Sequence, residues 1–329
     1  MLQLFRRKRT AATGAETVSL DPAFGDPDGA RLRQALRARD WSTARGILSA
    51  ASHPDDFSFY LRLATEAQGC EEWLPVIVRA QLHDTLPLLV YGARAIGWAW
   101  DARSSYRAKY VGRDQFELFF ERLRIAEDCL QGVVRREPDN TAAWCQLIIT
   151  ARGLQLGADE ARHRFDQAVA RHPHDVLAHR QLLQQLCPKW GGSFEAVHNF
   201  VRRAVTDAPP GSPLWSLVPD AHLEEYLERG HDKDALRYMR SATVRASLHE
   251  AADRSVRHPQ YVRRPGWPLV HNYFAAAFSL AGEPAAAAEQ FRILGDLATD
   301  RPWGYIGGFV PEREYCAHRA AAFRATGVR

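Results

Sequence analysis

The stretch AEDCLQGVVRREPDN, residues 126–140, sets a pattern that the chain repeats twice more. Small or apolar residues stand twelve, eight and five positions before Pro138, and the same offsets precede Pro173 and Pro209. Steps of four and three place these residues on one face of a helix, and a proline just beyond the last one ends it. Each stretch is therefore predicted to be the second helix of a hairpin. The residues concerned are Ala126, Leu130, Val133, Ala161, Phe165, Ala168, Val197, Val201 and Ala204.

The first helix of the clearest copy is predicted to begin at Trp144, with Leu147 and Ala151 at the following steps. This order of residues, together with prolines spaced 35 and 36 residues apart, resembles the tetratricopeptide repeat (TPR). Weaker copies at 39–48 and 274–294 extend the resemblance along most of the chain. The resemblance implies an all-α fold: a right-handed superhelix of stacked helical hairpins, or TPR-like α-solenoid, with a concave surface and elongated inter-helix loops.

The predicted domain organisation follows from the extent of the repeats. Residues 1–27 are expected to form a flexible basic tail, because their positive charges follow only a very short apolar piece. Residues 28–329 are expected to form a single TPR-like domain, closed by a capping helix at about 312–325. The connections at 102–114 and 257–268 are longer than helical connections usually are, so they depart from a plain repeat array.

The segment CPKWGGS, residues 187–193, falls between the two helices of one predicted hairpin. Pro188 is expected to end the first helix, and Ser193 to cap the second. Gly191 and Gly192 permit backbone angles that other residues avoid. Together with the Asp-Trp-x-x-Ala pattern near the N-terminus, this segment also resembles a bacterial family of repeat-like domains whose function is not established. That resemblance supports the fold and implies no activity.

Two interpretations of this loop stay open. Backbone N–H groups of the glycines, at the start of a capped helix and beside Lys189, would suit a carboxylate or phosphate. Alternatively, Trp190 fills a gap between hairpins and the glycines only turn the chain. In the repeat register, Arg152, Arg180 and Gln184 are expected on the concave face, where two arginines could hold a carboxylate in a forked arrangement.

A second group of aromatic and polar residues gathers near the C-terminus. It comprises Trp267, His271, Asn272, Trp303 and Tyr305. Such residues either build a pocket wall or close the last repeat as a hydrophobic cap.

Composition excludes several classes of protein. The net charge of +4 is mild, which disfavours a nucleic-acid partner. The five cysteines are scattered, and HEAAD at 249–253 departs from the zinc-binding HExxH pattern, so neither a disulfide framework nor a metal site is expected. The most apolar stretch, 86–100, is too short for a membrane span. Without glycine-rich nucleotide motifs, no cofactor is expected, and the location predicted is cytoplasmic.

These observations favour a scaffold or adaptor that binds a protein or peptide through its concave groove and the Lys189–Ser193 loop, with the arginines favouring an acidic partner. The alternative is an enzyme or small-ligand binder built on the same scaffold. Its pocket would lie between the 187–193 loop and the C-terminal aromatic residues, with Lys189, His271 and Tyr305 as polar groups. The sequence sets no oligomeric state.

Overall fold

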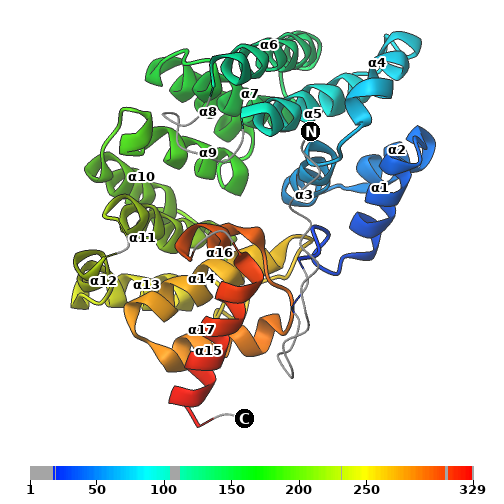
Figure 1. The fold of residues 1–329 in the computed structure, drawn as a ribbon. Coiled ribbons are helices and arrows are strands. Elements are labelled where there is room, and N and C mark those ends of the chain that lie inside the picture. The colour runs from blue at the N-terminus through cyan, green and yellow to red at the C-terminus, as the bar shows by residue number, and fades with distance from the viewer. Residues whose placement is uncertain (1–17, 19, 104–111, 231, 308–309, 328–329) are drawn as a thin grey trace.

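The computed structural model describes residues 18, 20–103, 112–230, 232–307 and 310–327. This part of the chain holds seventeen α-helices and no β-strand (Figure 1). The predicted all-α class is therefore confirmed for the described residues. No helix among them is both long and apolar enough to cross a membrane.

The N-terminal third packs its helices around one apolar core. Residues 1–17 of the expected tail lie outside the described residues. Val18 and Ala23 fall within the predicted tail but are buried, so the folded part of the chain begins earlier than predicted. Aspartates at the N-caps, Asp26 and Asp40, start the first two helices by accepting backbone N–H groups. The helices are α1 (Pro27–Arg37), α2 (Trp41–Ala50), α3 (Pro54–Thr65), α4 (Cys70–Ala80) and α5 (Leu86–Arg103).

The middle third contains the repeated pattern. Its helices are α6 (Arg113–Arg136), α7 (Thr141–Gly153), α8 (Ala158–Arg171), α9 (Val176–Leu186) and α10 (Phe194–Thr206). Of the nine residues predicted to share a buried face, eight are buried and Ala204 is half-buried. Asn140 and Asp175, two residues after the first two prolines of the pattern, cap α7 and α9. Each proline thus separates two helices, as the spacing predicted.

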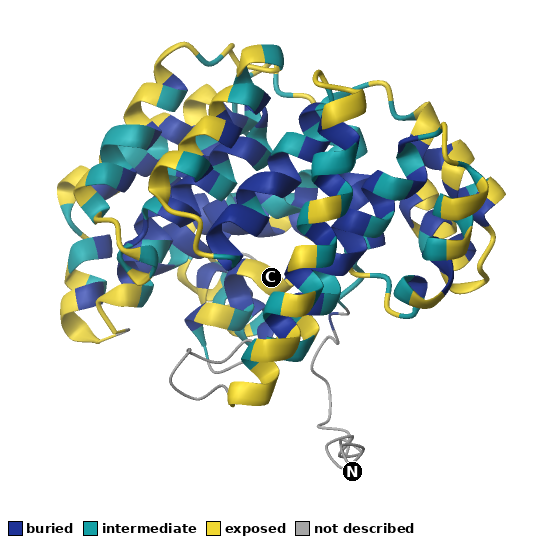
Figure 2. Ribbon diagram, turned by 90° about the horizontal axis from the view of Figure 1, so that it is seen from above, coloured by how far each residue is buried: buried dark blue, intermediate teal, exposed yellow. Residues whose placement is uncertain are grey.

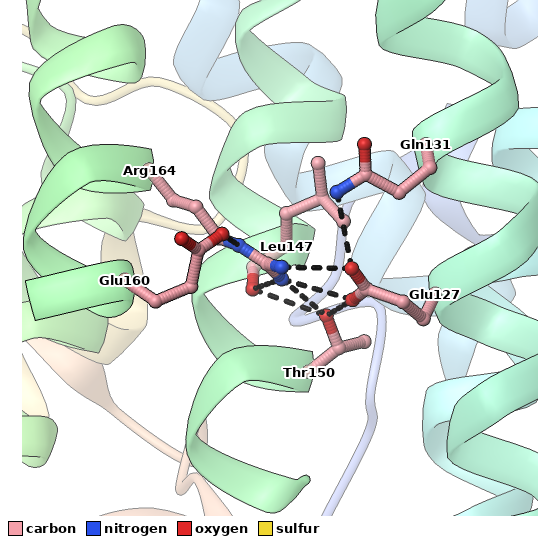
Figure 3. A network of polar contacts seen from close by, with 6 residues as sticks. All are labelled: Glu127, Gln131, Leu147, Thr150, Glu160 and Arg164. Carbon is pink, nitrogen blue, oxygen red and sulfur yellow. Dashed lines mark hydrogen bonds and ion pairs between the residues drawn. The ribbon is translucent and has the colours of Figure 1, made fainter. Parts of the chain in front are cut away.

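A buried ion pair joins α6, α7 and α8. The guanidinium of Arg164 donates to both carboxylate oxygens of Glu127, at 2.9 and 2.7 Å, and to Glu160 at 2.6 Å. It also donates to the carbonyl of Leu147 and the hydroxyl of Thr150, so its charge and its N–H groups are well partnered (Figure 3). Burial raises the pKa of Glu127, but hydrogen bonds from Arg164 and Thr150 outweigh it and lower the pKa below its usual value.

The C-terminal third is built around the apolar helix α14, which packs against α13, α15 and α16. Its last helix, α17, packs against α15 and α16 and buries Tyr315. The helices after α10 are α11 (Leu217–Glu228), α12 (Lys233–Met239), α13 (Ala242–Arg254), α14 (Trp267–Ala281), α15 (Pro284–Leu294), α16 (Asp300–Ile306) and α17 (Pro311–Ala325). Two 3-10 helices complete the described elements: η2 (Pro188–Trp190) lies between α9 and α10, and η3 (Pro213–Ser216) lies between α10 and α11.

The chain curves so that the connection before α14 comes close to the start of α3 (Figure 1). Arg264, in the connection before α14, lies 3.2 Å from the carboxylate of Asp56 at the start of α3. Helix α3 also packs against α7 and α9. Buried residues follow the facing sides of the helices, while exposed ones gather at their ends and outer turns (Figure 2).

Candidate functional site

The 187–193 loop is shaped by its own backbone. Gly191 has a φ of +89°, a left-handed conformation that favours glycine. A Cβ atom on Gly192 would overlap the carbonyl oxygen of Leu186. The N–H groups of Gly191 and Gly192 donate to the carbonyls of Pro188 and Cys187, at 2.9 and 3.2 Å. They are therefore not free to hold an anion, and the glycine part of our anion-site interpretation is wrong.

Ser193 and Trp190 have the structural roles that one interpretation gave them. The Ser193 hydroxyl accepts the N–H of Ala196 at 3.1 Å and so caps α10. The half-buried Trp190 ring meets the edge of Trp100 from α5, with ring centroids 6.5 Å apart. The guanidinium of Arg152 lies 5.7 Å from the same ring. Trp190 thus joins three segments of the fold, as a gap-filling side chain would.

The loop also carries Lys189 to an acidic residue on α11. The ammonium of Lys189 donates to one carboxylate oxygen of Glu224 at 2.6 Å, and the Gln184 amide donates to the other at 2.6 Å. Burial raises the pKa of Glu224, but Lys189 and Gln184 outweigh it and hold the pKa below its usual value. Glu224 is therefore ionised and bound on both oxygens.

One turn earlier on α11, Asp220 pairs with Arg180. The Nε of Arg180 lies 3.0 Å from the Asp220 carboxylate, and its guanidinium lies 4.7 Å from the centre of the Tyr273 ring on α14. Asp220 is almost completely buried, and this burial raises its pKa to about 6, more than the attraction of Arg180 lowers it. Its carboxylate is thus costly to ionise despite the ion pair.

Arg152 and Arg301 differ from Arg180 because neither contacts a carboxylate of the described residues. Arg152 is buried and donates to the carbonyl and side-chain oxygens of Gln181, at 3.0 and 2.8 Å. Burial first, and Arg301 second, lower the pKa of Arg152 to about 10. Arg301 is exposed and donates to the Tyr305 hydroxyl at 3.1 Å.

Arg301 belongs electrostatically with the same residues. Nearby protein displaces part of the hydration of this guanidinium, which acts to lower its pKa, but Tyr305, Tyr273 and Glu224 outweigh that effect and raise the pKa. Arg301 in turn acts on the pKa values of Arg152, Asp220 and Glu224. We call the whole group the polar cluster; it comprises Arg152, Arg180, Gln184, Lys189, Trp190, Asp220, Glu224, Tyr273, Arg301 and Tyr305.

The predicted C-terminal residues divide between two places. Tyr305 belongs to the polar cluster through Arg301. Trp303 and His271 are fully buried: the Trp303 indole donates to Asn272 at 2.6 Å, and His271 bonds Gln290 at 2.8 Å. Rings of Trp267 and Tyr261 cover His271, at centroid distances of 5.2 and 5.5 Å. These residues stabilise the interior around α14 and are not shown to reach the 187–193 loop.

Four members of the cluster were missing from the sequence analysis: Asp220, Glu224, Tyr273 and Arg301. The acidic pair has the i, i+4 spacing that puts both side chains on one face of α11. That spacing was available in the sequence, but it does not reveal which basic residues the face meets. Arg301 stands two residues before Trp303, and no periodic pattern in this stretch indicates which way its side chain points.

Two surface hollows lie away from the cluster. One, of about 560 Å³, is lined by residues of α1, α2 and α3, including Asp28, Ser42 and Asp56. The other, of about 410 Å³, is lined by residues of α4, α5 and α6 and the connection after α4. Neither includes a residue of the polar cluster.

No protein-family model fits the chain, and no curated protein is significantly similar to it in sequence. The geometry of the polar cluster is therefore the basis for a functional proposal.

Proposed function

We propose that the protein is a helical-repeat scaffold, a right-handed superhelix of the tetratricopeptide type, that binds a protein or peptide through the polar cluster. The observation that carries the proposal is the meeting of polar side chains from α7, α9, η2, α11 and α14. Arg301 of α16 acts on the pKa values of three of these side chains. These elements are far apart in the sequence. A stable fold needs apolar contacts between such elements more than it needs charged ones, so a concentration of charge is better explained by binding.

The charges of the cluster favour an acidic partner. It holds four basic side chains against two carboxylates, and the two carboxylates are already paired with Arg180 and Lys189. Lys189 and Tyr305 are exposed and Trp190 is half-buried. A partner could therefore contact a charged side chain and two aromatic side chains of the cluster. Tyrosine, tryptophan and arginine are the side chains that most often dominate binding interfaces.

A cytoplasmic location is part of the proposal. All five cysteines are free thiols, and three of them are buried. Unpaired cysteines are typical of a reducing compartment.

The small-ligand alternative receives less support. It required Lys189, His271 and Tyr305 to share a pocket, yet His271 is sealed beneath two aromatic rings. Tyr273, two residues further along α14, is the residue that meets Arg180. Positions two apart on a helix point in different directions, so His271 and the cluster lie on different sides of α14.

A selection experiment tests the proposal. Random peptides displayed against the immobilised full-length protein should be enriched in aspartate and glutamate. Binding of synthetic versions should then be measured by fluorescence anisotropy for the wild type and Lys189→Ala. We expect a weakening of roughly three- to tenfold, because one charge-assisted contact to the acidic peptide is lost and Glu224 is left to repel it.

Lys233→Ala is the matched control, since Lys233 is an exposed lysine at the start of α12. It should bind the peptides as the wild type does. Selected peptides without acidic residues, or peptides that bind Lys189→Ala and the wild type equally, would count against the polar cluster as the contact surface.

A further inference from the structure

The smaller of the two surface hollows, of about 410 Å³, lies where the connection after α4 meets the last turns of α6. Its apolar lining comes from Val78, Leu82 and Leu88. Leu82 is 67% exposed, more than any other large apolar residue of the described chain. Single exposed apolar residues are common on proteins, but three that line one concave surface are typical of a binding site.

The shape of this hollow is fixed by its surroundings. Gly132 of α6 lies in the lining, and a Cβ atom there would come within 3.1 Å of the Leu88 side chain. A larger residue at 132 would therefore fill part of the space. The Arg136 guanidinium donates to the carbonyl of Leu82 at 2.7 Å, which ties the connection after α4 to α6. A hollow that is already formed binds a partner at a lower entropic cost than one that must first become ordered.

Two basic side chains in the lining come from the last turn of α6. Arg136 donates to two backbone carbonyls, which are neutral acceptors. Arg135 is exposed and has no hydrogen bond or ion pair with another described residue. Its guanidinium therefore offers unused donors beside an apolar surface, and the planar donor set of a guanidinium matches a carboxylate.

The acidic groups near this hollow are committed to other residues. Asp84, which lies in the lining, has its carboxylate 2.9 Å from the guanidinium of Arg45. Glu137, the residue after α6, accepts from Thr85 and Asn140 and does not line the hollow. The negative end of a helix dipole is equivalent to roughly half an elementary charge, less than one arginine carries. A carboxylate from outside would therefore be attracted to the unpartnered arginine.

We propose that this hollow docks an acidic segment of a partner protein, in which a large apolar side chain stands close to a side-chain carboxylate. The apolar side chain packs against Leu82 and Leu88, and the carboxylate binds Arg135. A volume of about 410 Å³ is near the lower end for binding pockets, which suits a short anchoring segment. No residue of the polar cluster lines the hollow, so this contact is additional to the proposed function and does not depend on it.

Selection of displayed peptides tests the proposal. Random peptides are selected on the immobilised full-length protein in the presence of excess soluble Leu82→Glu, Arg135→Glu double variant, which removes peptides that bind elsewhere. Both residues are exposed, so the double variant should fold, and circular dichroism checks that it does. We expect the recovered peptides to place leucine, isoleucine, phenylalanine or methionine within a few positions of aspartate or glutamate.

The affinity of synthetic versions of these peptides is then measured by fluorescence anisotropy. Arg135→Ala should weaken binding roughly three- to tenfold, because a charge-assisted contact is lost. Leu82→Ala should weaken it roughly tenfold, because apolar area that the peptide buries is lost. Lys189→Ala should bind these peptides as the wild type does, because Lys189 does not line the hollow.

Arg203→Ala and Leu156→Ala are the matched controls. Arg203 is an exposed arginine in the last turn of α10, as Arg135 is in the last turn of α6. Leu156 is an exposed leucine in the connection between α7 and α8. Neither lines the hollow, so both variants should bind the peptides as tightly as the wild type.

The outcomes separate this site from the polar cluster. Peptides that lose affinity in Leu82→Ala and Arg135→Ala, but not in Lys189→Ala, would support the docking site whatever the polar cluster binds. Failure to recover peptides, or recovery of peptides without acidic residues, would overturn it. A wild-type dimer that Leu82→Ala dissociates in sedimentation velocity would assign the hollow to a second copy of this chain and also overturn it. The proposed function is decided separately, by whether peptides selected without the competitor depend on Lys189.

Discussion

Two arginine sites in this molecule show opposite solutions to the same physical problem. Arg164 is buried between α6, α7 and α8, and two glutamates, a hydroxyl and a backbone carbonyl accept from it (Figure 3). Arg152 is also buried, but its hydrogen-bond partners are the neutral groups of Gln181, and repulsion by Arg301 adds to the lowering of its pKa. Arg164 has carboxylate partners within the protein, whereas Arg152 has none among the described residues.

This difference distinguishes an arginine that stabilises the fold from an arginine that can bind an external anion. A buried cation whose anions belong to the same chain holds helices in register, and its removal leaves those anions unpaired. A cation that lacks an internal anion adds little to folding but can attract an external one. The largest experimental effects on stability are therefore expected at Arg164, and the smallest at Arg301.

Arg164→Ala should produce the largest loss of stability. It leaves the half-buried Glu127 without its cation, and breaking a largely buried pair on one side costs about 3 kcal/mol of unfolding free energy or more. Chemical denaturation followed by circular dichroism measures this loss. The double variant Arg164→Met, Glu127→Leu should lose less than the single variant, because no charge then remains unpaired. A single variant as stable as the wild type would show that this network is not structural.

Gly192→Ala should have the next largest effect. An added Cβ would meet the carbonyl oxygen of Leu186, so the loop or the end of α9 must shift, at a cost of roughly 2 kcal/mol. Gly46→Ala is the control, because its Cβ would meet nothing nearby and alanine favours helix α2. The control should be neutral or slightly stabilising. Equal stability of both variants would mean that packing does not require a glycine at 192.

The sequence predicted the parts of the fold that depend on local periodicity. The register that buried Leu130, Phe165 and Val201 followed from steps of three and four between them. The contact of Asp56 with Arg264 was beyond such reasoning, because 208 residues separate the two. A periodic pattern identifies which face of a helix is buried, but it does not identify the helix that covers it.

The candidate site was predictable only in part for the same reason. Arg152, Arg180, Gln184 and Lys189 were found because the repeat register gave their direction. Their acidic partners come from α11, whose position relative to α9 depends on the whole arrangement of helices. The two glycines of the loop allowed either interpretation, and the carbonyl groups that accept their N–H groups decided between them.

The pH dependence of anion binding gives a further test of whether the polar cluster binds an external anion. Burial raises the pKa of Asp220 to about 6. Above that pH its carboxylate opposes an incoming anion, and below it the carboxyl is neutral and the cluster is more positive. Wild-type affinity for sulfate, whose charge is constant in this range, should rise about threefold as pH falls from about 7.5 to about 5.

Asp220→Asn isolates this contribution. The variant should bind sulfate with the higher affinity at both pH values, because asparagine is neutral throughout. The raised pKa also means that the folded state binds this proton more tightly than the unfolded state does. Ionised Asp220 therefore lowers the stability of the fold above about pH 6, and this loss of stability disappears as pH falls through that value. A variant whose affinity still rose threefold on acidification would show that another group is responsible.

Arg301→Ala should leave the free energy of unfolding within about 0.5 kcal/mol of the wild type, the smallest effect of the series. The side chain is exposed, and its hydrogen bond reaches Tyr305, which is itself exposed. The same denaturation experiment measures it, with Arg203→Ala as the matched exposed arginine. A loss of 2 kcal/mol or more would place Arg301 in the same class as Arg164, because its charge would then serve the fold. Unchanged stability together with lost anion affinity would instead show that this guanidinium contributes to binding an external anion and not to folding.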